Sequence, residues 1–207
     1  MIRASPATLI FNQASLGLKE LMQIHQVLGY AKQERARGNI QESIRAATLV
    51  NTEIPDNAEA WLLNGFNYMN TSRLVIAVSH FTRYILLVPL DPLGWYLKGF
   101  CILKYTEYSE SISYFKQAAS LGMDYSDLWL WLGEAYMRSG KYFQAKQSLL
   151  AGSKHKISDP ARYYSFLFRS SKCLAIKPST KFDYRLEAVN FIKQNLAVKK
   201  LVCVGDS

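Results

Sequence analysis

The side chains that could support catalysis are scattered along this chain of 207 residues. The three histidines are far apart, and none stands beside a glutamate at the helical spacing that metal-binding motifs use. The sequence also lacks a glycine-rich loop that could cradle a phosphate. The three cysteines are odd in number and lack metal-ligand spacing. The sequence therefore predicts no catalytic residue, no metal site and no cofactor; the side chains concerned are His25, His80, His155, Cys101, Cys173 and Cys203.

The last three residues, Gly205, Asp206 and Ser207, form the one short motif that an enzyme could use. The apolar run before them, residues 201–204, is typical of a buried strand. This segment resembles the first block of the SGNH (GDSL-type) hydrolases, in which the serine is the nucleophile. The resemblance also implies a downstream Asp and His, which would lie beyond Ser207, and a serine without a base is not activated. We expect no hydrolase activity: either a catalytic domain follows in a longer gene product, or the match is chance.

Basic residues are concentrated in the C-terminal part of the chain. Residues 1–126 have a net charge of +1, whereas residues 127–207 contain 14 Lys and Arg against 6 Asp and Glu, a net +8. Such a surface attracts acidic proteins, nucleic acid or an anionic membrane face. The basic residues occur singly, so we expect an ordinary solvated surface and disfavour nucleic acid as a partner. No signal-peptide core and no run near 18 apolar residues occurs, which predicts a cytoplasmic protein without a membrane span.

A 34-residue interval organises the middle of the chain. Three tryptophans recur at this interval, and a glycine follows each of them four positions later: Trp61 and Gly65, Trp95 and Gly99, Trp129 and Gly133. A small residue stands sixteen positions after each tryptophan and a large apolar residue twenty after it: Ala77 and Phe81, Ser111 and Phe115, Ala145 and Leu149. This pattern resembles the tetratricopeptide repeat, whose period is about 34 residues.

The spacing within each unit predicts a pair of helices. Apolar residues four and seven positions apart share one face of a helix, and a helical hairpin of this kind needs neighbours to cover its apolar face. A glycine inside a helix costs about 1 kcal/mol relative to alanine. We therefore expect a second helix to approach each of these glycines closely, with Ala77, Ser111 and Ala145 at the crossings. The predicted fold is all-α, an α-solenoid of about five helical hairpins.

The repeats also set the expected boundaries. Three clear units cover residues 58–91, 92–125 and 126–159, and weaker copies cover 22–57 and 160–197. In the first weak copy Val27 and Ala31 replace the tryptophan and the glycine, and in the last copy Tyr163 replaces the tryptophan. We expect one repeat domain over residues 1–197 and a strand-like tail over residues 198–207.

The resemblance implies a binding surface on the first helix of each hairpin. The ligand-contacting positions of the family, carried onto this chain, give Leu62, Phe66, Met69, Asn70, Tyr96, Phe100, Lys104, Asp127, Leu130, Glu134 and Arg138. Most of these residues are apolar or aromatic, whereas members of the family that clamp a terminal carboxylate use Lys, Arg and Asn at such positions. The departure argues against the carboxylate-clamp subclass and favours an apolar groove.

Two alternatives stay open for this groove. It either captures a hydrophobic peptide or helix of a partner, or the chain fills it, through tight superhelical packing or with its N-terminal segment, Leu16 to Leu28. Trp131, two positions after Trp129, is also a candidate groove residue, and it is either a filler between repeats or an exposed binding residue.

We therefore expect a protein–protein interaction module that binds a peptide or helix of a partner in an apolar concave groove. The alternative is the N-terminal scaffolding region of a larger SGNH-type hydrolase or transferase whose catalytic domain is absent from this chain. Self-association is a third expectation, because the ends of a solenoid expose a face that a second copy could cover.

Overall fold

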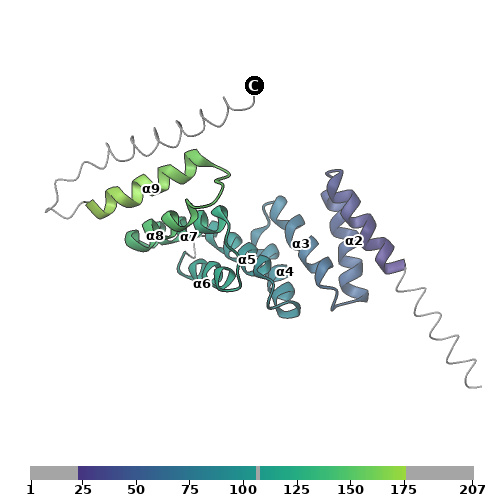
Figure 1. Ribbon diagram of the computed structural model, residues 1–207. Helices are drawn as coiled ribbons and strands as arrows, with labels where there is room; N and C mark the ends of the chain where they lie inside the picture. Colours follow the sequence, from purple (N-terminus) through teal and green to yellow (C-terminus); the bar gives the residue numbers. More distant parts are fainter. Residues whose placement is uncertain (1–22, 106–107, 176–207) are drawn as a thin grey trace, which may run out of the picture. The chain divides into compact units, whose positions relative to one another are not determined.

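The computed structural model describes residues 23–105 and 108–175, which form helices joined by short turns (Figure 1). A first helix over residues 23–36 is followed by α2 (Ile40–Glu53), α3 (Ala58–Asn70), α4 (Leu74–Leu87), α5 (Pro92–Lys104), α6 (Tyr108–Ser120), α7 (Ser126–Arg138), α8 (Tyr142–Gly152) and α9 (Pro160–Ala175). The all-α prediction is confirmed. The strand expected at residues 201–204, together with Ser207, lies outside the described residues.

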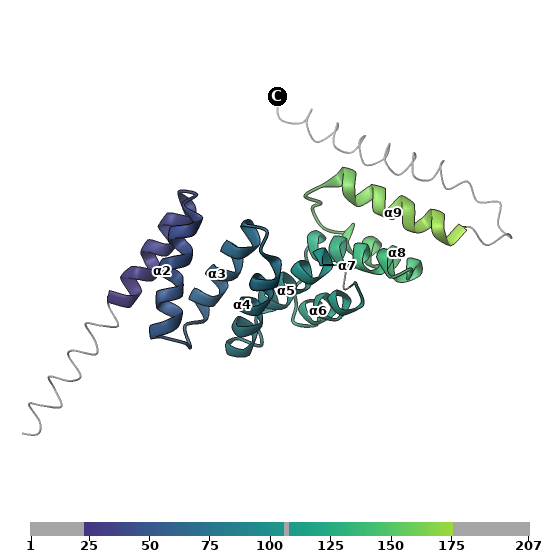
Figure 2. The same cartoon turned by 180° about the vertical axis from the view of Figure 1, so that it is seen from behind.

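The chain divides into two compact units, residues 1–101 and 102–207. In the first unit α2 packs against α3, and α3 packs against α4. In the second unit α7 packs against α6 and α8, and α9 packs against α8 and α7. These helices thus pack mainly against their neighbours in sequence, as stacked helical hairpins do, and both views show the paired helices (Figures 1 and 2).

Two of the repeat glycines let a second helix approach their own helix. A Cβ atom added to Gly65 of α3 would lie 2.4 Å from the Phe81 ring of α4, and one added to Gly133 of α7 would lie 2.7 Å from Leu149 of α8. Both distances are far below van der Waals contact. The expected close approach is confirmed at these positions, and the partner is the large residue one turn after Ala77 or Ala145.

The three repeat tryptophans are half-buried, and the indole of each donates a hydrogen bond to a residue that precedes it in the chain. The indole Nε1 of Trp61 donates to the carbonyl oxygen of Pro55 at 2.8 Å, and Nε1 of Trp95 donates to that of Pro89 at 2.9 Å. In the repeat over residues 126–159, Nε1 of Trp129 donates instead to the carboxylate of Asp124, at 2.6 Å. Each tryptophan therefore holds the loop that precedes its own helix.

Three turns between paired helices in the described part of the chain each contain one left-handed residue at the same repeat position. Gly38, Ser72 and Gly140 are spaced by 34 residues or twice that number, and their φ angles are 86°, 58° and 72°. The next residue after each closes the helix: the amide of Arg73 donates to the carbonyl of Tyr68, for example, at 2.8 Å. This is the hydrogen-bond pattern of a Schellman motif. Ser72 thus holds a conformation that favours glycine.

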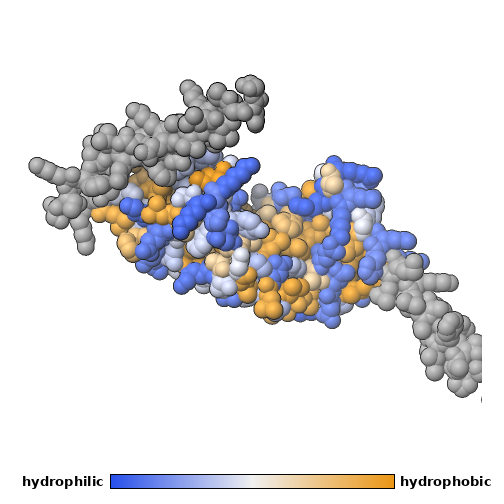
Figure 3. Space-filling model, viewed as in Figure 1, coloured by the Kyte–Doolittle hydropathy of each residue, from blue (hydrophilic) through white to orange (hydrophobic). Residues whose placement is uncertain are grey.

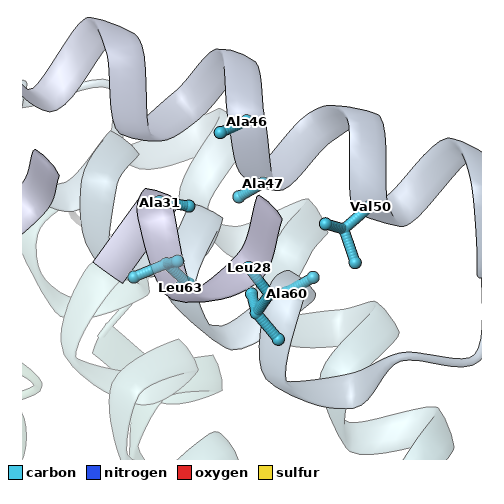
Figure 4. Close-up of a cluster of buried hydrophobic side chains, with 7 residues drawn as sticks. All are labelled: Leu28, Ala31, Ala46, Ala47, Val50, Ala60 and Leu63. Carbon is cyan, nitrogen blue, oxygen red and sulfur yellow. The ribbon is translucent and has the colours of Figure 1, made fainter. Parts of the chain in front are cut away.

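Alanines make up four of the seven buried residues in the cluster that the first hairpin forms with α3. Figure 4 shows this cluster, which contains Leu28, Ala31, Ala46, Ala47, Val50, Ala60 and Leu63. Leu28 therefore packs within its own hairpin and against α3. Residues 16–22 lie outside the described part of the chain, so the expectation that the segment Leu16 to Leu28 fills the groove stays a prediction.

One buried and one partly buried hydrogen bond join α2 to α3 beside this cluster. Asn67 Nδ2 donates to Ser43 Oγ at 2.8 Å, and Asn64 Nδ2 donates to Thr48 Oγ1 at 3.2 Å. Ser43, Asn64 and Asn67 are fully buried. Because an unpaired buried amide is costly, these pairs favour one register of α2 on α3.

Candidate functional site

The first unit carries a row of half-buried apolar residues on α3 and α5. Leu62, Phe66, Met69 and Tyr96 pack against the core cluster of this unit, which contains Phe81 and Leu97. Phe100 is also half-buried, and Asn70 at the end of α3 is exposed. These predicted groove residues thus have one side in the core and the other at the surface.

Phe66 is held from two sides. Its ring meets the edge of the Phe81 ring at a centroid distance of 5.9 Å. The guanidinium carbon of Arg35 lies 5.0 Å from the centre of the Phe66 ring. Arg35 belongs to the helix over residues 23–36, so this cation–π contact links the first hairpin to α3.

The second unit carries a different kind of surface, centred on Trp131 of α7. Lys104 Nζ lies 4.6 Å from the centre of the Trp131 ring, and the guanidinium carbon of Arg162 lies 4.3 Å from it. Lys104 is at the end of α5 and Arg162 is in the first turn of α9. Trp131 is half-buried and contacts side chains of two neighbouring helices; its role in binding stays a prediction.

A buried carboxylate anchors the cations around Trp131. Glu134 is only 1% exposed, and its two oxygens lie 2.5 Å from Arg138 Nη2 and 3.1 Å from Arg162 Nη2. A buried charge without such partners would be strongly destabilising. Glu134 therefore positions the two guanidinium groups at the surface.

Lys104 is affected by this arrangement. Burial lowers the pKa of its ammonium group, the Glu134 carboxylate opposes that shift, and the guanidinium groups of Arg162 and Arg138 lower the pKa further. Three cations thus share the field of one carboxylate.

Two predicted groove residues of α7 lie elsewhere. Leu130 is 3% exposed and packs with Leu149 and Tyr163 in the core of the second unit, so it contributes to packing rather than to a binding surface. The Asp127 carboxylate accepts a hydrogen bond from the Ser158 hydroxyl and so ties α7 to the loop before α9.

Sequence reasoning missed two residues that contact the side chains around Trp131. Arg162 was missed because it precedes Tyr163 by one residue, and that position is not among the contact positions of the family. Tyr108, the first residue of α6, was also missed; the Arg138 guanidinium lies 5.5 Å from the centre of its ring. The one sequence feature that could have indicated Arg162 was that the last repeat places a helix beside α7.

Two histidines, His80 and His155, contact side chains that have structural roles. The His80 ring lies 5.0 Å from that of Tyr68 and 5.2 Å from that of Trp61, and burial lowers its pKa. His155 Nε2 lies 3.0 Å from the Asp124 carboxylate that also binds Trp129. Within residues 23–105 and 108–175, no three His, Cys, Asp or Glu side chains are grouped so that they could hold a metal ion.

An apolar stretch of surface lies on α4, away from the residues predicted to bind. Val75 and Leu86 are exposed there, Leu86 by 68%, and Figure 3 shows apolar colour over this helix. None of the helices described is long and apolar enough to cross a membrane.

Comparison with known proteins agrees with this architecture. Residues 103–167 match the family described as tetratricopeptide repeat. A crystal structure of MamA protein has a TM-score of 0.75 at 20% identity, over 89% of this chain and 96% of that one. MamA 41-end from Desulfovibrio magneticus RS-1 has a TM-score of 0.72 at 16% identity, over 89% and 97%. YrrB, described as a TPR protein with an unusual peptide-binding site, has a TM-score of 0.67 at 13% identity, over 79% and 81%. No curated protein matches in sequence.

The stacked hairpins define an α-helical repeat protein, a class in which each unit contacts mainly its neighbours. Three observations point to the same kind of repeat, the tetratricopeptide repeat. They are the phased tryptophans and glycines, the family match over residues 103–167 and the structural neighbours. Residues 103–167 match the tetratricopeptide repeat family, and the described helices have the fold of tetratricopeptide-repeat solenoids. This fold is that of a protein–protein interaction module.

Proposed function

We propose that this protein binds a peptide or helix of a partner protein on the surface of the first helices of its hairpins. The observation that carries the proposal is the row of half-buried apolar side chains in the first unit: Leu62, Phe66, Met69, Tyr96 and Phe100. Aromatic anchors of this kind supply most of the affinity in many interfaces. Apolar side chains of a partner would bury the sides of these residues that the core leaves open.

The row is suited to binding because its members are already ordered. Phe66 is fixed between Phe81 and Arg35, and Met69 and Tyr96 rest on the same core cluster. A surface that is rigid before binding loses less conformational entropy when a partner docks. Both an amphipathic helix and an extended peptide can use such a row.

The experiment is a selection from a displayed peptide library, followed by titration calorimetry of the selected peptides. Met69→Ser and Tyr96→Ser should each weaken binding by about tenfold or more, because each removes a buried apolar contact. Leu86→Ser on α4 is the matched control, since it removes an exposed apolar residue from a different surface. Thermal melts confirm that all variants are folded.

Two results would contradict the proposal. In the first, the selected peptides bind the Met69→Ser and Tyr96→Ser variants as tightly as the unchanged protein. In the second, Leu86→Ser weakens binding as much as they do, which would place the binding surface on α4.

A further inference from the structure

We infer that the second unit binds a peptide segment with closely spaced Asp or Glu side chains. The binding surface is a group of five residues from α5, α7 and α9, which we name the Trp131 cluster: Lys104, Trp131, Glu134, Arg138 and Arg162. The inference rests on the proposed function, because it specifies the chemistry of the partner at one of its surfaces.

The charges of the Trp131 cluster are unequal. Its three cations and one carboxylate have a net charge of +2 at neutral pH. Glu134 contacts both guanidinium groups, and Lys104 lies in the field of this carboxylate and of both arginines. A carboxylate from a partner would reduce the repulsion among the three cations.

The two arginines are in place before a partner arrives. Glu134 is buried beneath them, Arg162 lies over the Trp131 ring, and Arg138 lies over the ring of Tyr108. Their side chains keep exposed fractions of 42% for Arg138 and 36% for Arg162. Since a guanidinium group has five N–H donors in a planar fork that matches a carboxylate, these accessible parts suit Asp and Glu side chains.

The charge around the cluster also selects an anionic partner. Residues 126–175, from the start of α7 to the end of α9, contain eight Lys and Arg against three Asp and Glu. A net positive field of this kind steers acidic segments toward the surface.

The arrangement favours an acidic peptide over nucleic acid. Nucleic acid is bound through phosphate contacts that follow the backbone, with aromatic rings open for stacking on bases. Here two guanidinium groups pair with a single carboxylate, and Lys104 and Arg162 lie over the Trp131 ring. A short run of side-chain carboxylates fits that arrangement.

Fluorescence anisotropy with the full chain tests the inference. The probe is a labelled twelve-residue peptide of alternating Glu and Ser, amidated at its C-terminus so that binding reports side-chain carboxylates. The comparison peptide has Gln in place of every Glu. We expect the acidic peptide to bind about tenfold or more tightly, because charge-assisted hydrogen bonds are lost with Gln, and we expect its affinity to fall as salt rises.

Variants locate the binding on the Trp131 cluster. Lys104→Gln, at an exposed position, should weaken binding of the acidic peptide by about tenfold. Arg162→Gln should do the same. If it unfolds, the double variant Arg162→Gln/Glu134→Gln replaces this ion pair with two amides and is compared with Glu134→Gln alone, because Arg138 loses the same carboxylate in both. Lys154→Gln, exposed in the loop after α8, is the matched control for loss of one positive charge.

Several outcomes would overturn the inference. The first is equal affinity for the Glu and Gln peptides, and the second is unchanged affinity of folded Lys104→Gln for the acidic peptide. The third is a loss of affinity in Lys154→Gln as large as that in Lys104→Gln. The fourth is tighter binding of a labelled oligothymidylate than of the acidic peptide. If library peptides still depend on Met69 and Tyr96 but show no acidic preference, the proposed function stands and this inference fails. If no peptide of either kind binds, both fail.

Discussion

Trp61 and Pro55 are joined by a hydrogen bond of 2.8 Å from the indole Nε1 to the proline carbonyl oxygen. Trp95 repeats this bond with Pro89 at 2.9 Å, 34 residues later. The phased tryptophans of this chain thus act through a polar group as well as through their apolar rings. The 34-residue spacing of Trp61 and Trp95 therefore marks two hydrogen bonds that join a helix to the loop before it.

Trp61→Phe should lower the free energy of unfolding by about 1 kcal/mol for the lost hydrogen bond, with a further loss from the smaller ring. Urea denaturation followed by circular dichroism measures the change. Trp95→Phe, which removes the equivalent bond, should give a similar value. A change below about 0.3 kcal/mol in both variants would show that the bond contributes nothing net, since a typical net contribution is about 1 kcal/mol.

Gly133→Ala should destabilise the protein, because the added Cβ would lie 2.7 Å from Leu149 Cγ and overpacking costs about 1–3 kcal/mol. Gly29→Ala is the matched control: it lies in the helix over residues 23–36, and an added Cβ meets nothing within 4 Å. That control should stabilise the protein by up to about 1 kcal/mol. Thermal melts that rank the two variants in the reverse order would contradict the packing of α7 on α8.

Ser72→Gly should stabilise the protein by about 0.5–1 kcal/mol. Ser72 has a φ angle of 58°, where a side chain costs about 1–2 kcal/mol and glycine does not, although glycine has greater entropy in the unfolded chain. Ser79→Gly, at an exposed position inside α4, should instead cost a similar amount. Denaturant midpoints of the two variants compare them directly, and destabilisation by Ser72→Gly would be inconsistent with a left-handed turn.

The helices were predictable because the phased residues are those that set backbone spacing. Gly65 and Gly133 mark where a second helix must approach, and each contact is made within one hairpin. Such local contacts repeat with the sequence period. The all-α solenoid therefore follows from residue types alone.

The Trp131 cluster was only partly predictable, because its contacts cross between hairpins. Glu134 and Arg162 are 28 residues apart, and their ion pair depends on how α9 stacks on α7. Leu130 shows the same limit: a position implied to be at the surface is covered by Tyr163, where the last, atypical repeat packs against it. The position of a residue within the repeat predicts its contacts inside its own hairpin better than its contacts with the following hairpin.

Ser43→Ala should lower the free energy of unfolding by about 1–3 kcal/mol, because it leaves Asn67 Nδ2 buried without its acceptor. The double variant Ser43→Ala/Asn67→Ala should lose less than the sum of the two single variants, since it removes the donor as well. Urea denaturation of the four proteins completes the cycle. Strict additivity would show that the two side chains do not interact.

Acidification should weaken the fold through His80. Burial lowers the pKa of this imidazole below its ordinary value of 6.5, so the unfolded chain takes up a proton at a pH where the folded protein does not. The free energy of unfolding should therefore be highest above pH about 6.5 and should decrease as the pH falls toward the folded-state pKa. His80→Gln should reduce this slope between pH 7.5 and 5 in denaturation experiments. An unchanged slope would assign the pH dependence to other groups.

The polar pair between α2 and α3 also bears on how such an array can grow. At the next joint of the first unit, the positions equivalent to Ser43 and Asn67 hold Ala77 and Cys101, which are buried in an apolar cluster. If a gene duplication inserted a second copy of residues 58–91 directly after the first, the Asn67 of the copy would face Ala77 and find no acceptor. The hairpins share a backbone but are not interchangeable, so lengthening this protein by tandem duplication would require a compensating substitution at the new joint.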